Sequence, residues 1–330
     1  MEQAIKTIPE LNVTTQDGWK LKAYHHVNQH SKFSPILVFH AMSLSAYSMN
    51  GNEGLPSIGV WLSLKGFDVW VCECRGVGKS FHKDKRKRKE WTFDEHLNYD
   101  VPAFLDSIQK ETNKNKFHWI GHSMGGHLLL AHLCVTNDNR IQSGVIAGSG
   151  FEVSDSIDKY AGHTKLLNVL QIKIIPLKLI SRLSRPLLKM IPDNYGYFSK
   201  KLTGYRNCLT IMKDIHDIPT SLLKYAFNCY RKGGLRNSDG KVIYSEKAKE
   251  INIPLLFISG NMDLAWIPQV IQDNIKFFSS GITKALPFGK EYGHIDNYGH
   301  VDIMMGKNSE KEVFPEILNW LMEKEKKYSA

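Results

Sequence analysis

Five residues, Gly-His-Ser-Met-Gly at positions 121–125, join a short apolar segment to a segment of helical composition. Residues 117–120 have the pattern of a buried strand, and residues 125–133 have the pattern of a helix. A serine at such a strand-to-helix turn is held in a strained conformation that points its hydroxyl away from the sheet. The flanking glycines leave room for the adjoining strand and helix. The pattern predicts that Ser123 is a nucleophile, and the alternative is a small residue in a tight glycine turn.

Short apolar runs alternate with helical stretches through much of the chain. Bounded by glycine or polar residues, such runs are typical of parallel strands that are covered on both faces. Their alternation with helices predicts an α/β fold with a mostly parallel, doubly wound sheet. Before the first run, residues 11–24 alternate around Asp17-Gly18 and predict a β-hairpin. The runs are Pro35–Phe39, Phe67–Cys72, Phe117–Ile120, Ser143–Ala147 and Pro254–Ser259.

Residues 151–249 break this alternation and contain no clear strand. Within them, residues 165–192 are apolar and basic, and Pro176, Pro186 and Pro192 divide them into short helices. We therefore expect residues 1–150 and 250–330 to form the two parts of the core. Residues 151–249 are expected to form a helical cap inserted between them.

A nucleophilic serine needs a general base, and the base needs an acid that orients it. For this kind of turn the expected order along the chain is serine, acid, histidine. Asp263 follows a predicted strand, where open α/β sheets place their sites, although it could also be a turn residue that caps a helix near Pro268. His294 and His300 both follow Tyr-Gly and compete for the role of base. His300 leads into a final helix expected at residues 310–323, and His294 stays open as the alternative.

Two backbone amides are expected to bind the oxyanion that such chemistry creates. One is the amide of Met124, directly after the serine, and the other belongs to the loop after the strand at Pro35–Phe39. That loop continues His-Ala-Met-Ser from residue 40, and Met42 is the expected second donor.

Six stretches together resemble the α/β-hydrolase superfamily, in particular its acid-lipase-like branch and related bacterial hydrolases. They are FHAM, GFDVWVCECRGVGKS, WTFDEHLNYDVPAFLD, HWIGHSMGGHL, ISGNMD and YGHVDIMMGKNSEKEVFPEILNWL, and they cover most of residues 35–148 and 250–321. The resemblance implies an α/β-hydrolase fold with a catalytic triad of Ser123, Asp263 and His300. It also implies that the amides of Met42 and Met124 form the oxyanion hole.

The resemblance also separates the two histidines. The family pattern places x-Asp-φ-φ-x-Gly after the histidine, where φ is apolar, and Asp302 and Gly306 give His300 this pattern, whereas His294 lacks it. Ala41 stands where such lipases usually carry glycine. Residues 151–249 carry no matching motif, so this segment is expected to set substrate specificity.

These observations predict a serine hydrolase, similar to esterases and lipases, that cleaves carboxylic esters through an acyl-enzyme. The apolar cap segment favours a small-molecule or lipid ester with a hydrophobic acyl group, and no metal or organic cofactor is expected. The same triad would serve an acyltransferase or a thioesterase. A non-catalytic ligand-binding protein of the same fold is the third alternative. The ester, its chain length and the oligomeric state stay open.

The net charge of +10 is compatible with an anionic partner. The basic run at residues 82–90 lacks the interleaved aromatic residues of single-strand binding, so no nucleic acid is expected. The basic and apolar residues 165–192 are typical of a helix on an anionic membrane surface. They equally suit a lid whose lysines reach water, and the two interpretations are compatible.

The five cysteines are sparse and odd in number, which does not suggest a disulfide framework and favours a reducing compartment. The first residues lack the pattern of a signal peptide, and no run of 18 apolar residues occurs. The expected location is therefore the cytoplasm.

Overall fold

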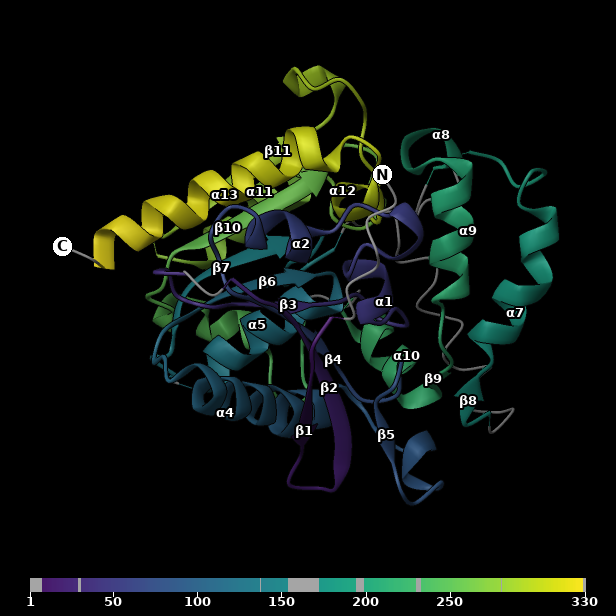
Figure 1. The fold of residues 1–330 in the computed structure, drawn as a ribbon, viewed down its shortest axis with the longest axis horizontal. Coiled ribbons are helices and arrows are strands. Elements are labelled where there is room, and N and C mark those ends of the chain that lie inside the picture. The colour runs from purple at the N-terminus through teal and green to yellow at the C-terminus, as the bar shows by residue number, and fades with distance from the viewer. Residues whose placement is uncertain are drawn as a thin grey trace.

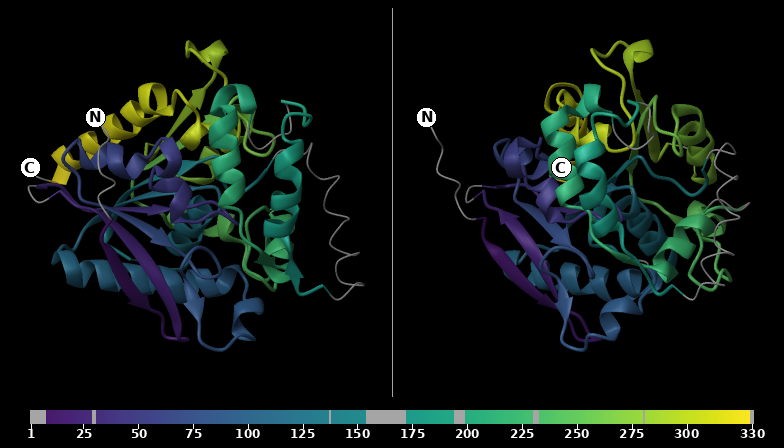
Figure 2. Two further views of the ribbon diagram at one scale, coloured as in Figure 1. Left: turned by 45° about the vertical axis from the view of Figure 1, so that its right-hand side comes forward. Right: turned by 90° about the vertical axis from the view of Figure 1, so that its right-hand side faces the viewer.

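The computed structural model of the chain describes residues 8–28, 31–136, 138–153, 172–193, 199–229, 233–279 and 281–328. Within them, one twisted sheet crosses the molecule, and helices cover both of its faces (Figures 1 and 2). The sheet has nine strands in the order β1-β2-β4-β3-β6-β7-β10-β11, and β5 also pairs with β2. Neighbours from β4 to β11 are parallel, whereas β2 is antiparallel to its three partners. The predicted doubly wound α/β architecture is confirmed.

The strands of this sheet are short. They are β1 (Glu10–Thr14), β2 (Trp19–His26), β3 (Ile36–Phe39), β4 (Val69–Glu73), β5 (Phe81–His82), β6 (Phe117–His122), β7 (Ile141–Ala147), β10 (Leu255–Gly260) and β11 (Thr283–Phe288).

The helices around the sheet differ widely in length. They are α1 (Ala46–Met49), α2 (Ile58–Ser63), α3 (Phe93–Glu95), α4 (Val101–Thr112), α5 (Met124–Val135), α11 (Pro268–Asn274), α12 (Asp302–Met305) and α13 (Ser309–Tyr328). Short 3-10 turns are η1 (Asn52–Gly54), η2 (Lys87–Lys89), η6 (Tyr244–Glu250), η7 (Ile275–Phe277) and η8 (Lys290–Tyr292), and one π-helical turn is η3 (His96–Asp100).

The five apolar runs of the sequence form the centre of the sheet. Every residue of β3, β4, β6, β7 and β10 is buried. One core cluster includes residues of α4 and α5, and another includes residues of α2 and α13. Because both faces are covered, these strands need no polar face, which is why they appear as continuous apolar runs. The prediction of all five is confirmed, with boundaries shifted by two residues or fewer in most cases.

The predicted hairpin is also confirmed. Strands β1 and β2 are antiparallel, with Thr14 opposite Lys20, and Gly18 in the turn has a φ of +94°. Strand β11 was not predicted. It lies at the edge of the sheet, and most of its residues are only partly buried, so its sequence lacks a continuous apolar run.

Residues 172–229 contain mostly helices, which lie together at one end of the sheet (Figures 1 and 2). They are α7 (Leu177–Ser184), η5 (Arg185–Leu187), α8 (Lys200–Thr203), α9 (Tyr205–Lys213) and α10 (Thr220–Asn228). Pro176 precedes α7 as its N-cap residue, and Pro186 lies in η5, so these prolines divide the segment as expected.

The expectation that this segment lacks strands is wrong in one detail. Strands β8 (Ile174–Ile175) and β9 (Ile218–Pro219) form a small antiparallel pair. Two residues are too few to show an alternating pattern, so these strands could not be predicted from the sequence. Residues 154–171 of the expected cap lie outside the described residues, and the division into a core of residues 1–150 and 250–330 with a cap of residues 151–249 stays a prediction.

The last helix, α13, begins at Ser309 and ends at Tyr328, which makes it longer than the expected residues 310–323. Across the described parts of the chain, no helix combines the length and the apolar character needed to cross a bilayer.

Candidate active site

Ser123 lies between β6 and α5 with a φ of +54° and a ψ of −116°. This is a strained region for a residue with a β-carbon. A β-carbon on Gly121 would lie 2.3 Å from the carbonyl carbon of Gly125, and one on Gly125 would lie 2.4 Å from the oxygen of Phe39. The strained turn is therefore compatible with its neighbours only when both flanking residues are glycine. This geometry matches the turn expected from the sequence.

Asp263 and His300 contact each other directly. The Nδ1 atom of His300 lies 2.7 Å from Oδ2 of Asp263, and both side chains are buried. The other oxygen, Oδ1, accepts the backbone N–H groups of Ala265 at 2.9 Å and Trp266 at 3.1 Å. Asp263 thus orders its own loop and also holds His300, whereas the N-cap residue of α11 is Ile267. Nδ1 points to the acid, so a serine or a substrate would meet the ring at Nε2.

Burial by itself would raise the pKa of the Asp263 carboxyl. The charge of His300 and the hydrogen bonds from His300, Trp266 and Ala265 outweigh burial and hold this pKa below its ordinary value. The carboxylate is therefore ionised at neutral pH and can stabilise a positively charged imidazole ring.

The end of β7 brings the serine turn and the acid–histidine pair to one place. The N–H of Ser123 donates to the carbonyl of Ala147 at 2.9 Å. The next residue, Gly148, is so close to the pair that a β-carbon on it would lie 3.1 Å from Nδ1 of His300 and 3.2 Å from Oδ2 of Asp263. All these residues follow the carboxyl ends of parallel strands, where sheets of this class place their sites.

The two candidate histidines lie in different surroundings. Whereas His300 contacts Asp263, the Nδ1 atom of His294 lies 3.1 Å from the carbonyl oxygen of Gly289, and its ring packs on Phe288. The structure therefore brings His300, and not His294, to the acid.

The loop after β3 is held from inside the core by His40. Its Nδ1 atom lies 2.8 Å from the carbonyl oxygen of Ala41, and its Nε2 atom accepts the N–H of Cys74 at 3.1 Å. Burial lowers the pKa of His40 to about 4, so the ring is neutral and Nδ1–H donates to Ala41. The left-handed residue of this loop is Ser43, with a φ of +64°, and not Ala41. Alanine in place of the usual glycine therefore introduces no left-handed strain at position 41.

The two expected oxyanion donors lie at the ends of neighbouring strands. Met124 is the first residue of α5, where helix amides are free to point at an anion, and Met42 lies in the loop held by His40. Their role as an oxyanion hole stays a prediction.

Known proteins resemble this chain both in sequence and in fold. Residues 55–204 match the model of a hydrolase family described as serine aminopeptidase, S33. A putative aryl esterase from Burkholderia cenocepacia superposes with a TM-score of 0.60 at 15% identity, covering 96% of this chain and 99% of its own. The monoacylglycerol lipase of Paleococcus ferrophilus superposes with a TM-score of 0.58 at 17% identity, covering 92% and 99%. The chain has the fold of the α/β-hydrolase superfamily.

The curated relatives of this α/β hydrolase include lipases. Triacylglycerol lipase 2 of Arabidopsis thaliana is 32% identical over 129 residues, which are 35% of this chain and 31% of the relative. Human gastric triacylglycerol lipase is 32% identical over 127 residues, which are 35% of this chain and 32% of the relative. The matched part of the hydrolase thus spans about a third of the length of these relatives.

Three residues that we did not select from the sequence form a series of contacts that begins at His300. The ring of Trp266 stacks on His300 at 5.5 Å between centroids and lies 5.2 Å from His127, at the start of α5. The hydroxyl oxygen of Tyr225 in α10 lies 2.5 Å from Nδ1 of His127. Burial lowers the pKa of His127 to about 3, so this ring is neutral. No local sequence pattern distinguishes these residues, because their contacts join distant parts of the chain.

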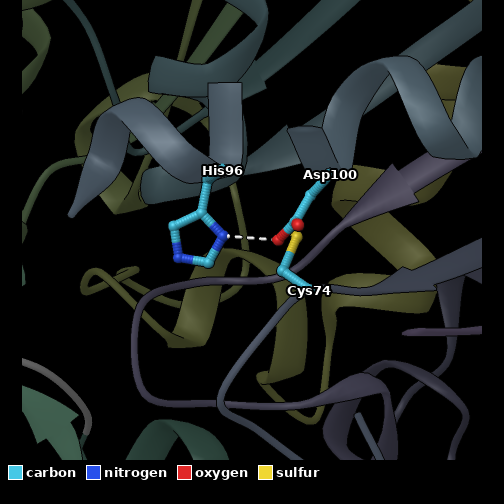
Figure 3. A group of neighbouring side chains, drawn as sticks. All are labelled: Cys74, His96 and Asp100. Atoms are coloured by element: carbon cyan, nitrogen blue, oxygen red, sulfur yellow. Dashed lines mark hydrogen bonds and ion pairs between the residues drawn. The ribbon is translucent and has the colours of Figure 1, made fainter. Parts of the chain in front are cut away.

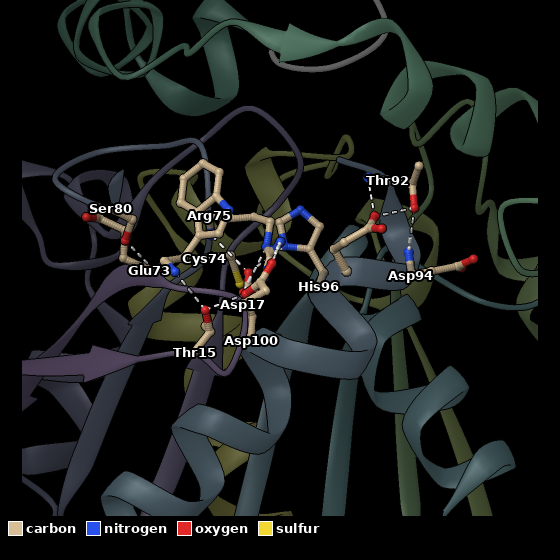
Figure 4. Close-up of polar contacts among 12 residues, drawn as sticks. Thr15, Asp17, Glu73, Cys74, Arg75, Ser80, Thr92, Asp94, His96 and Asp100 are labelled. Atoms are coloured by element: carbon tan, nitrogen blue, oxygen red, sulfur yellow. Dashed lines mark hydrogen bonds and ion pairs between the residues drawn. The ribbon is translucent and has the colours of Figure 1, made fainter. Parts of the chain in front are cut away.

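A buried ionic network lies under the carboxyl end of β4 (Figure 4). Arg75 bonds to Asp100 through Nε at 2.9 Å and Nη2 at 2.8 Å, and Nη1 contacts Asp17 at 2.8 Å. His96 adds a contact to Asp100 at 2.9 Å. These residues tie the first hairpin, β4 and η3 together.

Among the described residues, Cys74, His96 and Asp100 form a group that could supply metal ligands, with atoms within 4.8 Å of one another (Figure 3). The guanidinium of Arg75 already neutralises Asp100, and Nδ1 of His96 bonds to the same carboxylate. Burial raises the pKa of the Cys74 thiol, so it stays protonated. The donor set suits a structural ion pair rather than a cation site.

A pocket of about 400 Å³ lies beside the start of α1, where Ser45 and Tyr47 line it. Its walls include Tyr24, Tyr47, Glu73, Asp214 and His216, and none of the three candidate triad residues lines it. Burial raises the pKa of Glu73 to about 7.

Proposed function

We propose that this α/β hydrolase is a serine hydrolase that cleaves carboxylic esters by way of an acyl-enzyme. The observation that carries the proposal is the buried 2.7 Å contact between His300 and Asp263 beside the strained turn of Ser123. The lipases and esterases among its relatives support ester hydrolysis in general terms.

In the proposed mechanism, Nε2 of His300 accepts the proton of the Ser123 hydroxyl while the serine oxygen attacks the ester carbonyl. The amides of Met42 and Met124 bind the oxyanion of the tetrahedral intermediate. His300 then gives its proton to the leaving alcohol, and the acyl group stays on Ser123. Water, activated by the same histidine, releases the carboxylic acid. Asp263 stays ionised throughout and stabilises the imidazolium.

The substrate class that we propose is a small-molecule or lipid ester with a hydrophobic acyl group. The names of the relatives, which include triacylglycerol and monoacylglycerol lipases, support a lipid ester. Residues 151–249 are the segment expected to select the acyl chain.

The test is hydrolysis of a chain-length series of p-nitrophenyl esters by the wild type and by Ser123→Ala, together with labelling by a serine-reactive phosphonate. Turnover and labelling that disappear together in the variant would support the proposal, and the chain-length profile would describe the acyl pocket. Labelling of Ser123 without ester hydrolysis would instead favour acyl transfer or a thioester substrate. A wild type that is not labelled would favour a non-catalytic binding protein.

We also propose that α7 contacts an anionic membrane surface. Leu179, Ile180 and Leu183 expose 53–66% of their surface, and Met190 beyond the helix exposes 80%. The inner face carries Ser181, which is buried and donates to the carbonyl of Met212 at 2.6 Å. The helix thus turns apolar residues outward, and exposed cations accompany them. These cations are Lys178, Arg182 and Lys189. Such a surface favours an interface between anionic head groups and acyl chains.

A reducing, cytoplasmic location is the third part of the proposal. All five cysteines are buried free thiols, which supports a compartment where disulfides are not formed. Cell fractionation of the full-length chain is the direct test, and recovery in an oxidising compartment would contradict it.

A further inference from the structure

The end of α9 contacts the loop that carries Met42 and the start of α1 (Figure 1). Asp214, directly after α9, accepts the backbone N–H groups of Ser45 at 3.0 Å and Ser48 at 3.2 Å, and also the hydroxyl of Ser45. The N–H of His216 donates to the carbonyl of Ser43 at 2.8 Å. We call this set of contacts, between residues 214 and 216 and residues 43–48, the cap–loop joint.

The loop needs external support because its conformation is not the one that its residues prefer. Ser43 adopts a φ of +64°, a left-handed conformation that costs free energy for any residue other than glycine. His40 holds the loop at Ala41 from the core, and the cap–loop joint holds it at Ser43 and Ser45 from the opposite side. Met42 lies between these two supports, so the direction of its amide depends on both.

Asp214 is built for holding backbone rather than for binding water. Its side chain is 4% exposed, and its two oxygens receive three donors from residues 45 and 48. Charge-assisted hydrogen bonds of this kind are stronger than neutral ones. Replacing the carboxylate with an amide of the same size would remove the charge that strengthens these hydrogen bonds, and it would turn the oxygen that accepts the Ser45 hydroxyl into a donor.

We propose that Asp214 is a positioning residue for the oxyanion hole: through the cap–loop joint it fixes the loop of Met42, so that the seating of α9 controls stabilisation of the transition state. The proposal rests on the proposed function, because it assigns no role if Ser123 forms no acyl-enzyme.

The same helix offers a matched control. Glu53 in η1 contacts Thr210 at 3.1 Å and Lys213 at 2.7 Å, so it also joins α9 to the core. Lys213 and Glu53 are exposed, and Glu53 also accepts the hydroxyl of Tyr47 at 2.8 Å, but it contacts neither the backbone of residues 43–48 nor His40. Glu53→Gln therefore weakens the docking of α9 and keeps every hydrogen bond to the backbone of residues 43–48.

Stabilisation of an oxyanion acts in the transition state, so its loss lowers kcat and leaves KM nearly unchanged. Removing a whole donor costs about 10²–10³-fold in kcat, and a misdirected donor should cost less. We therefore expect Asp214→Asn to lower kcat by about 10–100-fold, with KM within about threefold of the wild type.

The experiment measures kcat and KM on the best p-nitrophenyl ester, the rate of phosphonate labelling, and the inhibition constant of a trifluoromethyl ketone, which forms an oxyanion on the serine. In Asp214→Asn, labelling and ketone affinity should fall in parallel with kcat/KM, and Glu53→Gln should match the wild type in all three. Ser45→Ala, which removes one donor from the loop side, should show a smaller loss of the same kind. If Asp214→Asn does not fold, Ser45→Ala is used for the test in its place.

Equal losses in Asp214→Asn and Glu53→Gln would overturn the proposal, because they would reflect docking of α9 alone. A higher KM in Asp214→Asn with an unchanged affinity for the ketone would overturn the proposal as well. If the phosphonate labels Ser123 in the wild type, and Asp214→Asn and Ser45→Ala both keep full kcat, only this inference fails. If the wild type is not labelled at all, the proposed function fails first.

Discussion

At the scale of single residues, His300 is held on three sides. Asp263 binds Nδ1, Trp266 stacks on the ring, and His122 reaches the backbone carbonyl of His300 with Nε2 at 2.9 Å. Burial, and then the charge of His300, lower the pKa of His122 to about 3, so His122 is neutral and donates this hydrogen bond. The ring of His300 therefore keeps one tautomer and one orientation, which is what a general base requires.

Replacing each candidate histidine by alanine in a separate variant tests the assignment of His300 as the base. Because only His300 contacts Asp263, His300→Ala should lower ester turnover by at least about 10³-fold, and His294→Ala should keep most of it. Steady-state kinetics with both variants gives the comparison, and thermal unfolding of each checks the fold. The reverse pattern would assign the base to His294.

Asp302 shows how burial affects a carboxyl group close to the candidate site. Burial raises its pKa to about 6, although Thr203, Ser199 and Gly299 all donate hydrogen bonds to it. In the unfolded chain the group ionises near its ordinary pKa of 3.8. Between these two values the folded state binds more protons than the unfolded state, so this group makes the protein less stable as the pH rises from about 4 to about 6.

Asp302→Asn removes this titration. The free energy of unfolding of the variant, relative to that of the wild type, should therefore increase by about 2–3 kcal/mol between pH 4 and pH 7.5. Urea unfolding of both proteins at a series of pH values measures the difference. A difference that does not depend on pH would mean that Asp302 ionises normally in the folded protein.

At the scale of elements, α7 and α9 carry two separate proposals. Helix α9 ends at the cap–loop joint, and α7 packs on α9 through Ser181. Leu179 and Leu183 of α7 face outward. An outward apolar face on a helix with exposed cations predicts binding to lipid without a membrane-spanning segment. The two helices would thus link a membrane surface to the loop of Met42.

Vesicle binding tests the outward face of α7. Burying a leucine in lipid contributes about 1.5–3 kcal/mol, so Leu183→Ser should weaken binding to anionic vesicles by about tenfold or more. Leu64→Ser is the matched control, because Leu64 is 79% exposed but lies at the end of α2. Cosedimentation with neutral and anionic vesicles gives the affinities. Equal binding by both variants would argue against α7 as the contact.

At the scale of the whole molecule, the sheet and its helices enclose all five thiols. Cys72, Cys74, Cys134, Cys208 and Cys229 are buried, and burial raises the pKa of each, to about 12 for the last three. A buried, protonated thiol is a poor nucleophile.

The native protein should therefore react with a coloured disulfide reagent only as fast as it opens, and all five thiols should react after unfolding in denaturant. The absorbance of the released thiolate counts the reactive groups. Fast reaction of one thiol in the native state would show that part of the core opens readily.

Features that depend on neighbouring residues in the chain could be predicted from the sequence alone. Continuous apolar runs predicted β3, β4, β6, β7 and β10, since strands that are covered on both faces show this pattern. The spacing of Gly121, Ser123 and Gly125 predicted the strained turn, and the clash that Gly121 avoids is with Gly125, only four residues further along the chain. Residue types alone left both His294 and His300 open, and only the resemblance to a family favoured one of them.

The tertiary structure decided the contacts between residues that are far apart in the chain. The pairing of His300 with Asp263, the network of Arg75 with Asp100 and the seating of Asp214 on Ser45 each join separate loops or helices. Edge strand β11 belongs to the same group, because its place was set by pairing with β10 rather than by its own composition. Such contacts depend on how the sheet orders its strands, and no local pattern of charge or hydrophobicity encodes that order.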